Sequence, residues 1–341
     1  MSKSSSSLQP QSMTIFQACS AYLDNVALAR SANTARTYQN GMQVFLNCLK
    51  ISGLDPEKTP VELLREDAIG WFSAALKDYS PTTERLYLTA ATGFFEYLAA
   101  EDLLPVNLAR VRMLIRQRAR RPGLRLPQFP IDAIEKILSE ITTIRNFETM
   151  DSHEKLRFLR DRAFLLTLAD TGLRVHEACG LRRGDLDWLN GQAIIIGKGN
   201  RQDIVRFSRR AQSALQEYLA ARAAFDGSSG RPLTALPLFA RHDRGAGKKV
   251  KPITTATGRN IVTDSVREIL GDDAVGTITP HSFRHYFVTR VLRSSKNLKL
   301  AQELARHRNI AVTQRYAHLT NDELDKGYWQ AIEDTKEDLD E

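Results

Sequence analysis

Apolar residues recur at helical spacing through the first hundred residues of the chain. The first repeat comprises Ile15, Phe16, Cys19, Tyr22, Leu23 and Val26, the pattern of a helix that buries one face. Comparable repeats cover residues 33–49, 68–76 and 81–98. The last of these starts with Ser80, which can cap a helix, and Pro81, which suits the first helical turn. No strand pattern intervenes, so we predict a helical domain over residues 13–105, after a disordered tail of residues 1–12.

The second half of the chain combines helical repeats with one strand signal. Helices are predicted over residues 131–141, 155–171 and 211–224. Between the last two, the apolar stretches 193–196 and 204–207 flank a turn that contains Gly197, Lys198 and Gly199. This pattern indicates a β-hairpin with a lysine at its tip. The predicted fold class is therefore mainly α, with a helical domain followed by an α+β domain, residues 131–341, that carries a small antiparallel sheet.

Composition narrows the class of protein. Of 341 residues, 42% are hydrophobic and 26% are charged, which is typical of a soluble globular protein that is long enough for two domains. No apolar run approaches the ~20 residues that span a membrane, and the first residues lack the apolar core of a secretory signal. A cytoplasmic location without membrane contact is therefore expected. Cys19, Cys48 and Cys179 are widely spaced, which argues against disulfides and zinc sites.

Positive charge is concentrated between the two predicted domains. The net charge of +8 favours a polyanionic partner. Residues 106–130, the predicted linker, contain no acidic residue but seven arginines: Arg110, Arg112, Arg116, Arg118, Arg120, Arg121 and Arg125. A solvated helix face is one interpretation, and a segment that follows the phosphates of DNA is the other, which we prefer. The candidate DNA-binding residues are Arg36, Arg85, Arg112, Arg116, Arg118, Arg120, Arg121 and Lys249.

Four short segments carry residues suited to phosphoryl transfer. In chain order they are Thr171–Glu177, Gly197–Gly199, His281–His285, and His307 with Tyr316 nine positions later. Arg174 and Arg284 can each offer a fork of donors to phosphate oxygens. His281 lies one helical turn before Arg284, so the two side chains share a face.

Three further side chains complete this candidate catalytic set. His307 can donate a hydrogen bond, Lys198 can protonate a leaving oxygen, and Tyr316 supplies a nucleophilic hydroxyl. In such a reaction, positioning and charge stabilisation dominate. No carboxylate cage for Mg²⁺ occurs in these segments, so we expect neither a metal nor another cofactor.

The ordered set of motifs resembles the tyrosine site-specific recombinase family, also called the phage integrase family, over residues 14–320. The chain is most similar to its simple two-domain type, the Xer-like and Cre-like recombinases. The resemblance implies that Arg174 and Arg284 hold the scissile phosphate, with His281 and His307 completing the pocket. Lys198 would protonate the departing 5′ oxygen, while Tyr316 would attack and form a 3′-phosphotyrosyl link. Glu177 would orient the site.

The resemblance also implies partners and an assembly. Double-stranded DNA with specific recombination sites would be held in a C-shaped clamp of the two domains. A homotetramer, with a dimer on each site, would form through the amphipathic C-terminal helix predicted over residues 321–334. One position departs from the family pattern, because Arg306 stands where a glycine is common before the second histidine. We interpret Arg306 as an additional phosphate contact.

Three alternative functions remain open from the sequence. A type IB topoisomerase would share this chemistry but would relax DNA as a monomer, without joining two sites. A catalytically inactive DNA-binding protein would keep the fold alone, although the complete set of six residues argues against decay. A helical DNA-binding regulator would account for the charge but not for the ordered motifs. Integration, excision and dimer resolution are not distinguished by the sequence.

Overall fold

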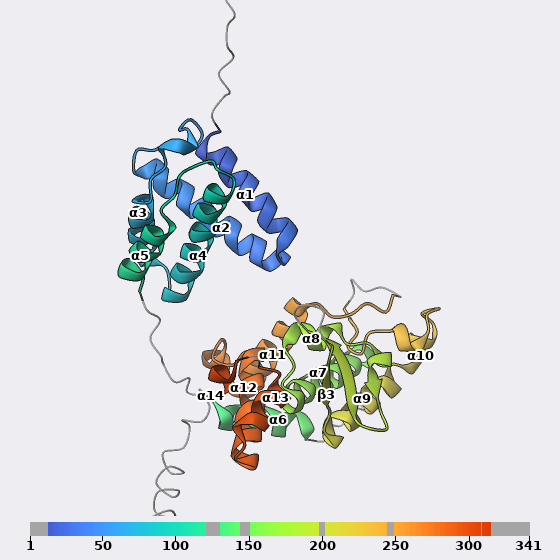
Figure 1. The fold of residues 1–341 in the computed structure, drawn as a ribbon. Coiled ribbons are helices and arrows are strands. Elements are labelled where there is room, and N and C mark those ends of the chain that lie inside the picture. Colours follow the sequence, from blue (N-terminus) through green and yellow to red (C-terminus); the bar gives the residue numbers. More distant parts are fainter. Residues whose placement is uncertain are drawn as a thin grey trace, which may run out of the picture. The chain divides into compact units, whose positions relative to one another are not determined.

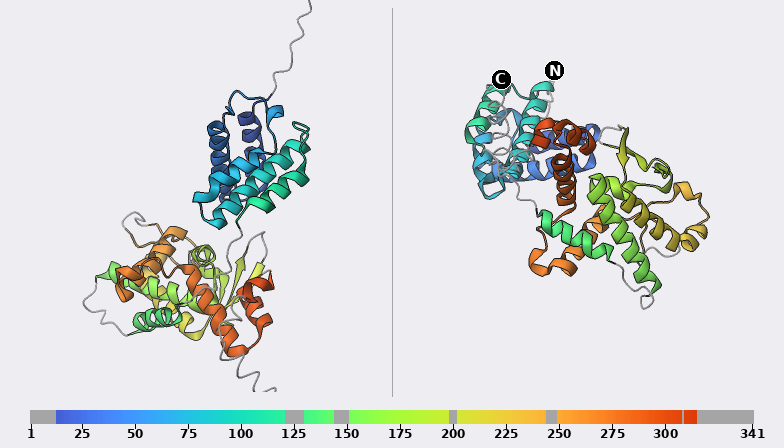
Figure 2. Two further views of the ribbon diagram at one scale, coloured as in Figure 1. Left: turned by 90° about the vertical axis from the view of Figure 1, so that its left-hand side faces the viewer. Right: turned by 90° about the horizontal axis from the view of Figure 1, so that it is seen from below.

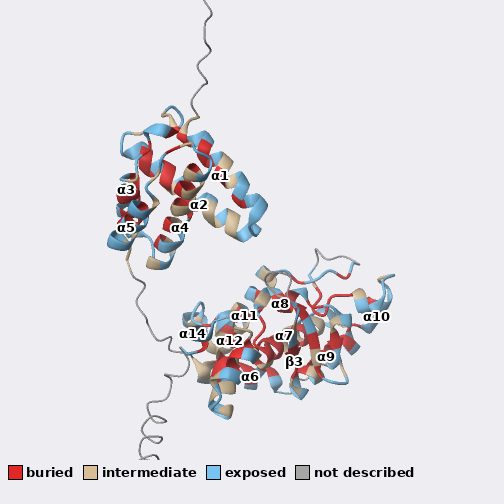
Figure 3. Ribbon diagram, in the orientation of Figure 1, coloured by how far each residue is buried: buried red, intermediate tan, exposed pale blue. Residues whose placement is uncertain are grey.

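The computed structural model describes residues 13–120, 130–143, 151–197, 202–243, 249–307 and 309–314. The chain divides into two compact units, Met1–Arg125 and Leu126–Glu341. Each unit has its own hydrophobic core, which Figure 3 shows as buried faces turned inward within each unit. In the described ranges, no helix is both long and apolar enough to cross a membrane.

The first unit is a bundle of helices (Figure 1). Its α-helices are α1 (Ile15–Ala29), α2 (Ala32–Ile51), α3 (Ala68–Ala75), α4 (Pro81–Ala100) and α5 (Leu108–Arg118), with short 3₁₀ turns at Val61–Leu63 and Leu76–Asp78. The start of α4 is capped as predicted, because the Ser80 side chain accepts a hydrogen bond from the backbone N–H of Thr83. A cluster of aromatic rings, among them Phe45, Phe72 and Phe94, fills the core.

Helix α5 corrects the predicted extent of the linker, residues 106–130. Val111 is fully buried and Leu114 is nearly so, and both belong to the core of the first unit. The helix begins at a cap, where the side chain of Asn107 accepts from the N–H of Arg110. Among the many arginines, Val111 and Leu114 form a short apolar face one helical turn apart. This face packs in the core, so the segment belongs to the first unit and is not a linker between the units.

The second unit is mainly helical and contains a small sheet. Its α-helices are α6 (Ile131–Thr142), α7 (Ser152–Thr171), α8 (Val175–Gly180), α9 (Arg209–Ala221), α10 (Ala223–Gly227), α11 (Thr255–Leu270), α12 (Pro280–Ser295), α13 (Leu298–Ala305) and α14 (Ile310–Gln314). Short 3₁₀ turns lie at Arg183–Asp185, Leu233–Ala235 and Asp272–Ala274. The strands are β1 (Leu186–Asp187), β2 (Gln192–Ile196) and β3 (Gln202–Arg206). The predicted fold class, mainly α with a small antiparallel sheet, is confirmed.

The sheet is the predicted hairpin with one short strand added. Strands β2 and β3 pair antiparallel, with Ile194 opposite Ile204, and β1 joins the other edge of β2. Ala193, Ile195 and Val205 point into the core, whereas Ile194 and Ile204 are exposed on the outer face. The views in Figure 2 show the strands side by side at the surface of the second unit. Strand β1 was not predicted, because two residues carry no readable alternation.

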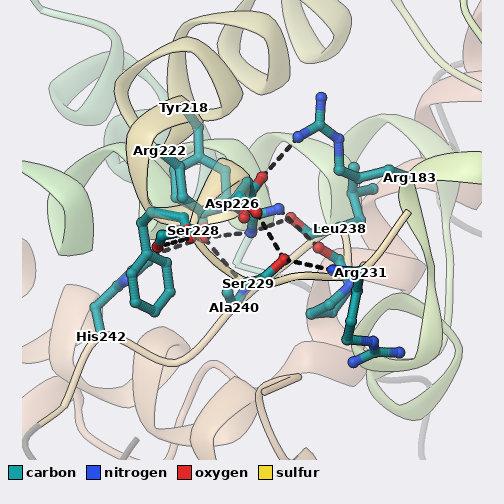
Figure 4. A network of polar contacts seen from close by, with 12 residues as sticks. Arg183, Tyr218, Arg222, Asp226, Ser228, Ser229, Arg231, Leu238, Ala240 and His242 are labelled. Carbon is teal, nitrogen blue, oxygen red and sulfur yellow. Dashed lines mark hydrogen bonds and ion pairs between the residues drawn. The ribbon is translucent and has the colours of Figure 1, made fainter. Parts of the chain in front are cut away.

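A buried polar network fixes the region that follows α9 (Figure 4). Arg222 is fully buried, and its guanidinium donates to Asp226 Oδ2 at 3.0 Å and to the Tyr218 hydroxyl at 2.9 Å. Arg183 reaches the same Asp226 oxygen at 2.6 Å. The Tyr218 hydroxyl also lies 2.7 Å from Nε2 of His242, and burial lowers the pKa of His242 to about 3. Such a buried network specifies packing, and none of its members belongs to the predicted catalytic set.

Candidate active site

The turn between α7 and α8 presents Arg174. Helix α7 ends at Gly172, whose φ of +60° lies in the left-handed region that favours glycine. Two residues later, Arg174 caps α8, and Glu177 reaches back to it. The Glu177 carboxylate accepts from the backbone N–H of Arg174 at 2.8 Å and from its Nη1 at 2.7 Å. The Glu177 side chain is buried while that of Arg174 is 42% exposed, so a fixed carboxylate holds an accessible guanidinium.

The beginning of α12 supplies His281 and Arg284. Thr279 is the N-cap residue of the helix and Pro280 is its first residue. Arg284 is buried, and its Nη1 donates to the backbone oxygen of Gly172 at 2.5 Å. Its Nη2 donates to the carbonyl of Ala305, at the end of α13. Arg284 therefore ties together three segments that lie far apart in the sequence.

The end of α13 positions His307. Its backbone N–H donates to the carbonyl of Gln302 at 3.0 Å, and Nε2 of Gln302 donates to the His307 carbonyl at 2.9 Å. On the ring itself, Nδ1 lies 2.9 Å from the hydroxyl of Thr313 in α14. These contacts orient the imidazole and leave Nε2 as the nitrogen that is not engaged with Thr313. Gln302 and Thr313 were not predicted, because nothing in their spacing distinguishes them from ordinary helix residues.

Arg306 corrects an expectation from the sequence. Its side chain is only 7% exposed, and Nη2 lies 3.2 Å from Oε2 of Glu177. The same nitrogen lies 3.5 Å from the carbonyl oxygen of Gly172. The contact that we expected Arg306 to make with DNA phosphate is thus replaced by an ion pair inside the protein. The sequence could not show this, because Glu177 lies 129 positions away along the chain.

The electrostatics of the site follow from its surplus of cations. Burial lowers the pKa of His307 to about 4, and the charges that add to the effect are those of Arg284, Arg174, His281 and Arg306. The pKa of His281 is also lowered, by desolvation and by the charges of Arg284 and Arg174. Both imidazoles are accordingly neutral near pH 7. For Glu177, burial opposes ionisation, but hydrogen bonds from Arg174 and the charge of Arg306 outweigh it and lower the pKa.

The structure brings five of the predicted residues into one site and leaves two outside its description. Arg174, Glu177, His281, Arg284 and His307 are connected by the contacts and charges given above. Lys198 and Tyr316 lie outside the described residues, as do Arg121 and the predicted C-terminal helix. The arrangement offers two guanidiniums and two neutral imidazoles, which suits binding of a single phosphate group.

The candidate DNA-binding residues fall into two groups. Five of them in the first unit are exposed, Arg36, Arg85, Arg112, Arg116 and Arg118, as is Lys249 in the second unit. Two of the candidates have carboxylate partners. The exposed Arg112 pairs with the partly exposed Glu96 at 2.8 Å, whereas Arg120 donates to buried Glu84 at 2.6 Å and to the Tyr79 carbonyl at 2.5 Å. Arg120 is therefore part of the packing of the first unit, which a run of arginines does not reveal.

Comparison with known proteins identifies a family model and relatives that are similar in sequence to this chain. The model of the phage integrase family matches residues 132–323. A tyrosine recombinase XerC of Thermodesulfovibrio yellowstonii is 31% identical over 322 residues, which cover 93% of this chain and 96% of the relative. A tyrosine recombinase XerD of Listeria innocua is 28% identical over 88% of this chain and 92% of the relative.

Solved structures share the fold. XerH site-specific recombinase bound to palindromic difH substrate, in a post-cleavage complex, superposes with a TM-score of 0.67 and 20% sequence identity. The match covers 91% of this chain and 84% of that structure. A lambda integrase dimer bound to a COC′ core site gives a TM-score of 0.59 at 16% identity, over 89% of this chain and 95% of the other.

Proposed function

The chain belongs to the phage integrase family of tyrosine recombinases, enzymes that cleave and rejoin DNA, and we propose that it carries out site-specific recombination through a 3′-phosphotyrosyl intermediate on Tyr316. The observation that carries the proposal is the joining of Arg174 and Arg284 through one turn. Gly172 binds Arg284 by its carbonyl, and Arg174 follows two residues later. Two guanidiniums fixed this way can hold one phosphate between them.

In this mechanism the protein stabilises charge rather than supplying a cofactor. Tyr316 gives its proton to solvent, since the surrounding cations favour the phenolate; the phenolic oxygen then attacks the phosphorus, and the bond to the 5′ oxygen breaks. Arg174 and Arg284 bind the non-bridging oxygens, on which negative charge accumulates. The two histidines donate from neutral rings. In the reverse step a 5′ hydroxyl attacks the phosphotyrosine and releases Tyr316, so the bond energy is conserved and no nucleotide is consumed.

Lys198 is proposed as the acid that protonates the departing 5′ oxygen. It belongs to the segment that joins β2 to β3. Burial lowers the pKa of Arg306, and the charge of Asp203, the second residue of β3, is near enough to oppose this effect. This proximity supports placing the hairpin beside the active site.

The proposed partner is double-stranded DNA with specific recombination sites. Relatives with the same fold were solved with DNA, as their descriptions state. We propose that the helical first unit, including the exposed arginines at the end of α5, contacts the phosphates. We further propose a cytoplasmic homotetramer, with a dimer on each site, that serves integration and excision of a mobile element or resolution of dimers.

The test of the function is capture of covalent DNA by the full chain. Duplexes of randomised sequence, each with a nick that lets the cleaved end diffuse away, are incubated with the protein, and adducts resistant to detergent are isolated and sequenced. We expect an adduct with enriched sequence, and its loss in Tyr316→Phe, because the variant lacks only the attacking hydroxyl. Tyr328→Phe is the matched control. An adduct that persists in Tyr316→Phe would disprove the assigned nucleophile.

The assembly has its own test. Deletion of residues 321–341 should leave binding to one recovered site in place but abolish the complex that joins two sites, since the predicted C-terminal helix would no longer reach a neighbour. Native gels and light scattering on the recovered duplex measure both states. Undiminished pairing of two sites by the truncated chain would contradict assembly through this helix.

A further inference from the structure

Arg306 occupies a backbone position that favours glycine. Helix α13 ends there with φ +56° and ψ 44°, in the left-handed region. An arginine is strained in this conformation, because its Cβ approaches the following carbonyl oxygen. Glycine would relieve the strain and would also remove the guanidinium. The loss of strain is read from stability, and the loss of the guanidinium is read from the rate of cleavage.

The guanidinium of Arg306 touches the acceptors that hold both phosphate-binding arginines. Its Nη2 lies 3.2 Å from Oε2 of Glu177, whose Oε1 accepts from Arg174 at 2.7 Å. The same Nη2 lies 3.5 Å from the Gly172 carbonyl, which accepts from Arg284 at 2.5 Å. Arg306 thus contacts both the Glu177 carboxylate, which holds Arg174, and the Gly172 carbonyl, which holds Arg284.

The charge of Arg306 offsets that of the Glu177 carboxylate. Glu177 is a buried carboxylate inside a site that has to attract a phosphate anion, and alone it would offset the charge of Arg174. Arg306 adds a second cation to the same carboxylate, which leaves the site with a positive surplus. The side chain of Arg306 is 7% exposed, and within the described ranges its Nε and Nη1 have no hydrogen-bond partner. Its position is therefore set by the contacts of Nη2.

We propose that Arg306 is a positioning residue of the active site, which holds the Glu177 carboxylate and the Gly172 carbonyl so that Arg174 and Arg284 face the same phosphate. The proposal rests on the proposed function and gives a role to an arginine whose left-handed backbone favours glycine. Arg306 acts through the other two arginines and does not itself bind the reacting phosphate.

The test uses the full chain and the nicked duplex recovered by covalent capture. We expect Arg306→Gly to slow single-turnover cleavage about 10- to 100-fold, as misplaced catalytic groups do, while affinity for the duplex stays close to that of the wild type. Thermal unfolding should show only a modest loss of stability, because the relief of left-handed strain offsets part of the cost of losing the buried ion pair with Glu177. Arg306→Lys keeps a cation near Glu177 and should recover much of the rate.

Two comparisons make the result specific. Lys296 ends α12 in the same left-handed conformation, with φ +53°, and is exposed, so Lys296→Gly is a matched change that should keep the wild-type rate. In a Glu177→Gln background, Arg306→Gly should cost less than it does alone, because the carboxylate it acts on is gone.

The outcomes separate the two proposals. Wild-type cleavage by Arg306→Gly, or an equal loss in both backgrounds, would overturn the role of Arg306. Weaker binding with a lower salt dependence and unchanged cleavage of bound DNA would make Arg306 a direct phosphate ligand and would also overturn it. If the wild-type protein forms no adduct at all, the proposed function fails and this inference fails with it.

Discussion

At the scale of single residues, cations decide the protonation state of the histidines in the site. His307 and His281 both lie within the field of Arg174 and Arg284, and both have lowered pKa values. A histidine of ordinary pKa would be partly charged near neutral pH. Its charge would repel the guanidiniums of Arg174 and Arg284. Held neutral, each ring can donate one hydrogen bond to a phosphate oxygen without adding repulsion to the guanidiniums.

This state of His307 predicts a pH dependence of stability. The folded pKa of about 4 lies below the ordinary value of 6.5, so the unfolded chain binds this proton more readily than the folded one. Stability from this group should therefore be complete above pH 6.5 and should fall as the pH decreases from 6.5 towards 4. Urea unfolding across this range measures the slope, which should be shallower in His307→Gln. An NMR titration with a midpoint near 6.5 would contradict the prediction.

Glycine at the end of α7 shows how one residue serves several elements. Gly172 has φ +60°, its carbonyl accepts from Arg284, and an added Cβ would lie 2.4 Å from the ring of Phe287 in α12. The sequence shows the glycine and its closeness to Arg174. It does not show that α12 packs so tightly against this turn, because Phe287 is 115 positions further along the chain.

At the element scale, Gly172→Ala should destabilise the second unit by about 2–4 kcal/mol, from left-handed strain together with overpacking against α12. Gly230→Ala is the matched control. It has φ +67° and open space around the added Cβ, so it should cost only about 1 kcal/mol. Chemical denaturation of both variants measures the difference. Equal losses would show that α12 yields to the added methyl group.

Helix boundaries illustrate which elements are readable from local signals. Ser80 with Pro81 predicts the start of α4 because cap and proline act within one turn, and α12 begins with the same pair of signals at Thr279 and Pro280. Helix α5 was missed, since its stability comes from Val111 and Leu114 packing on other helices and not from its charged sequence. Propensity and charge describe a segment by itself, whereas burial depends on what lies beside it.

At the scale of the whole molecule, the two units have separate cores and should unfold separately. Glu84, buried in the first unit, binds both Lys77 and Arg120. Glu84→Ala should lower the stability of the first unit by about 2 kcal/mol, because two cations lose their shared partner. Calorimetry should show the transition of the second unit unchanged.

The control for this prediction lies on the same helix. Glu96 pairs with Arg112, but the two side chains are 44% and 62% exposed, so Glu96→Ala should cost less than about 1 kcal/mol. A single transition that shifts as a whole in Glu84→Ala would show instead that the two units unfold together.

The sequence by itself determined the class of the protein and the helical and α+β halves, and it predicted which residues form the candidate site. It could do so because caps, hairpin turns and helical repeats act over a few residues, and because the spacing of Arg174, His281, Arg284 and His307 forms a family pattern. Only the tertiary structure decided how these residues are held. The ion pair of Arg306 with Glu177 and the bond from Arg284 to Gly172 join residues more than a hundred positions apart. Such contacts depend on how the helices pack, which no local pattern records.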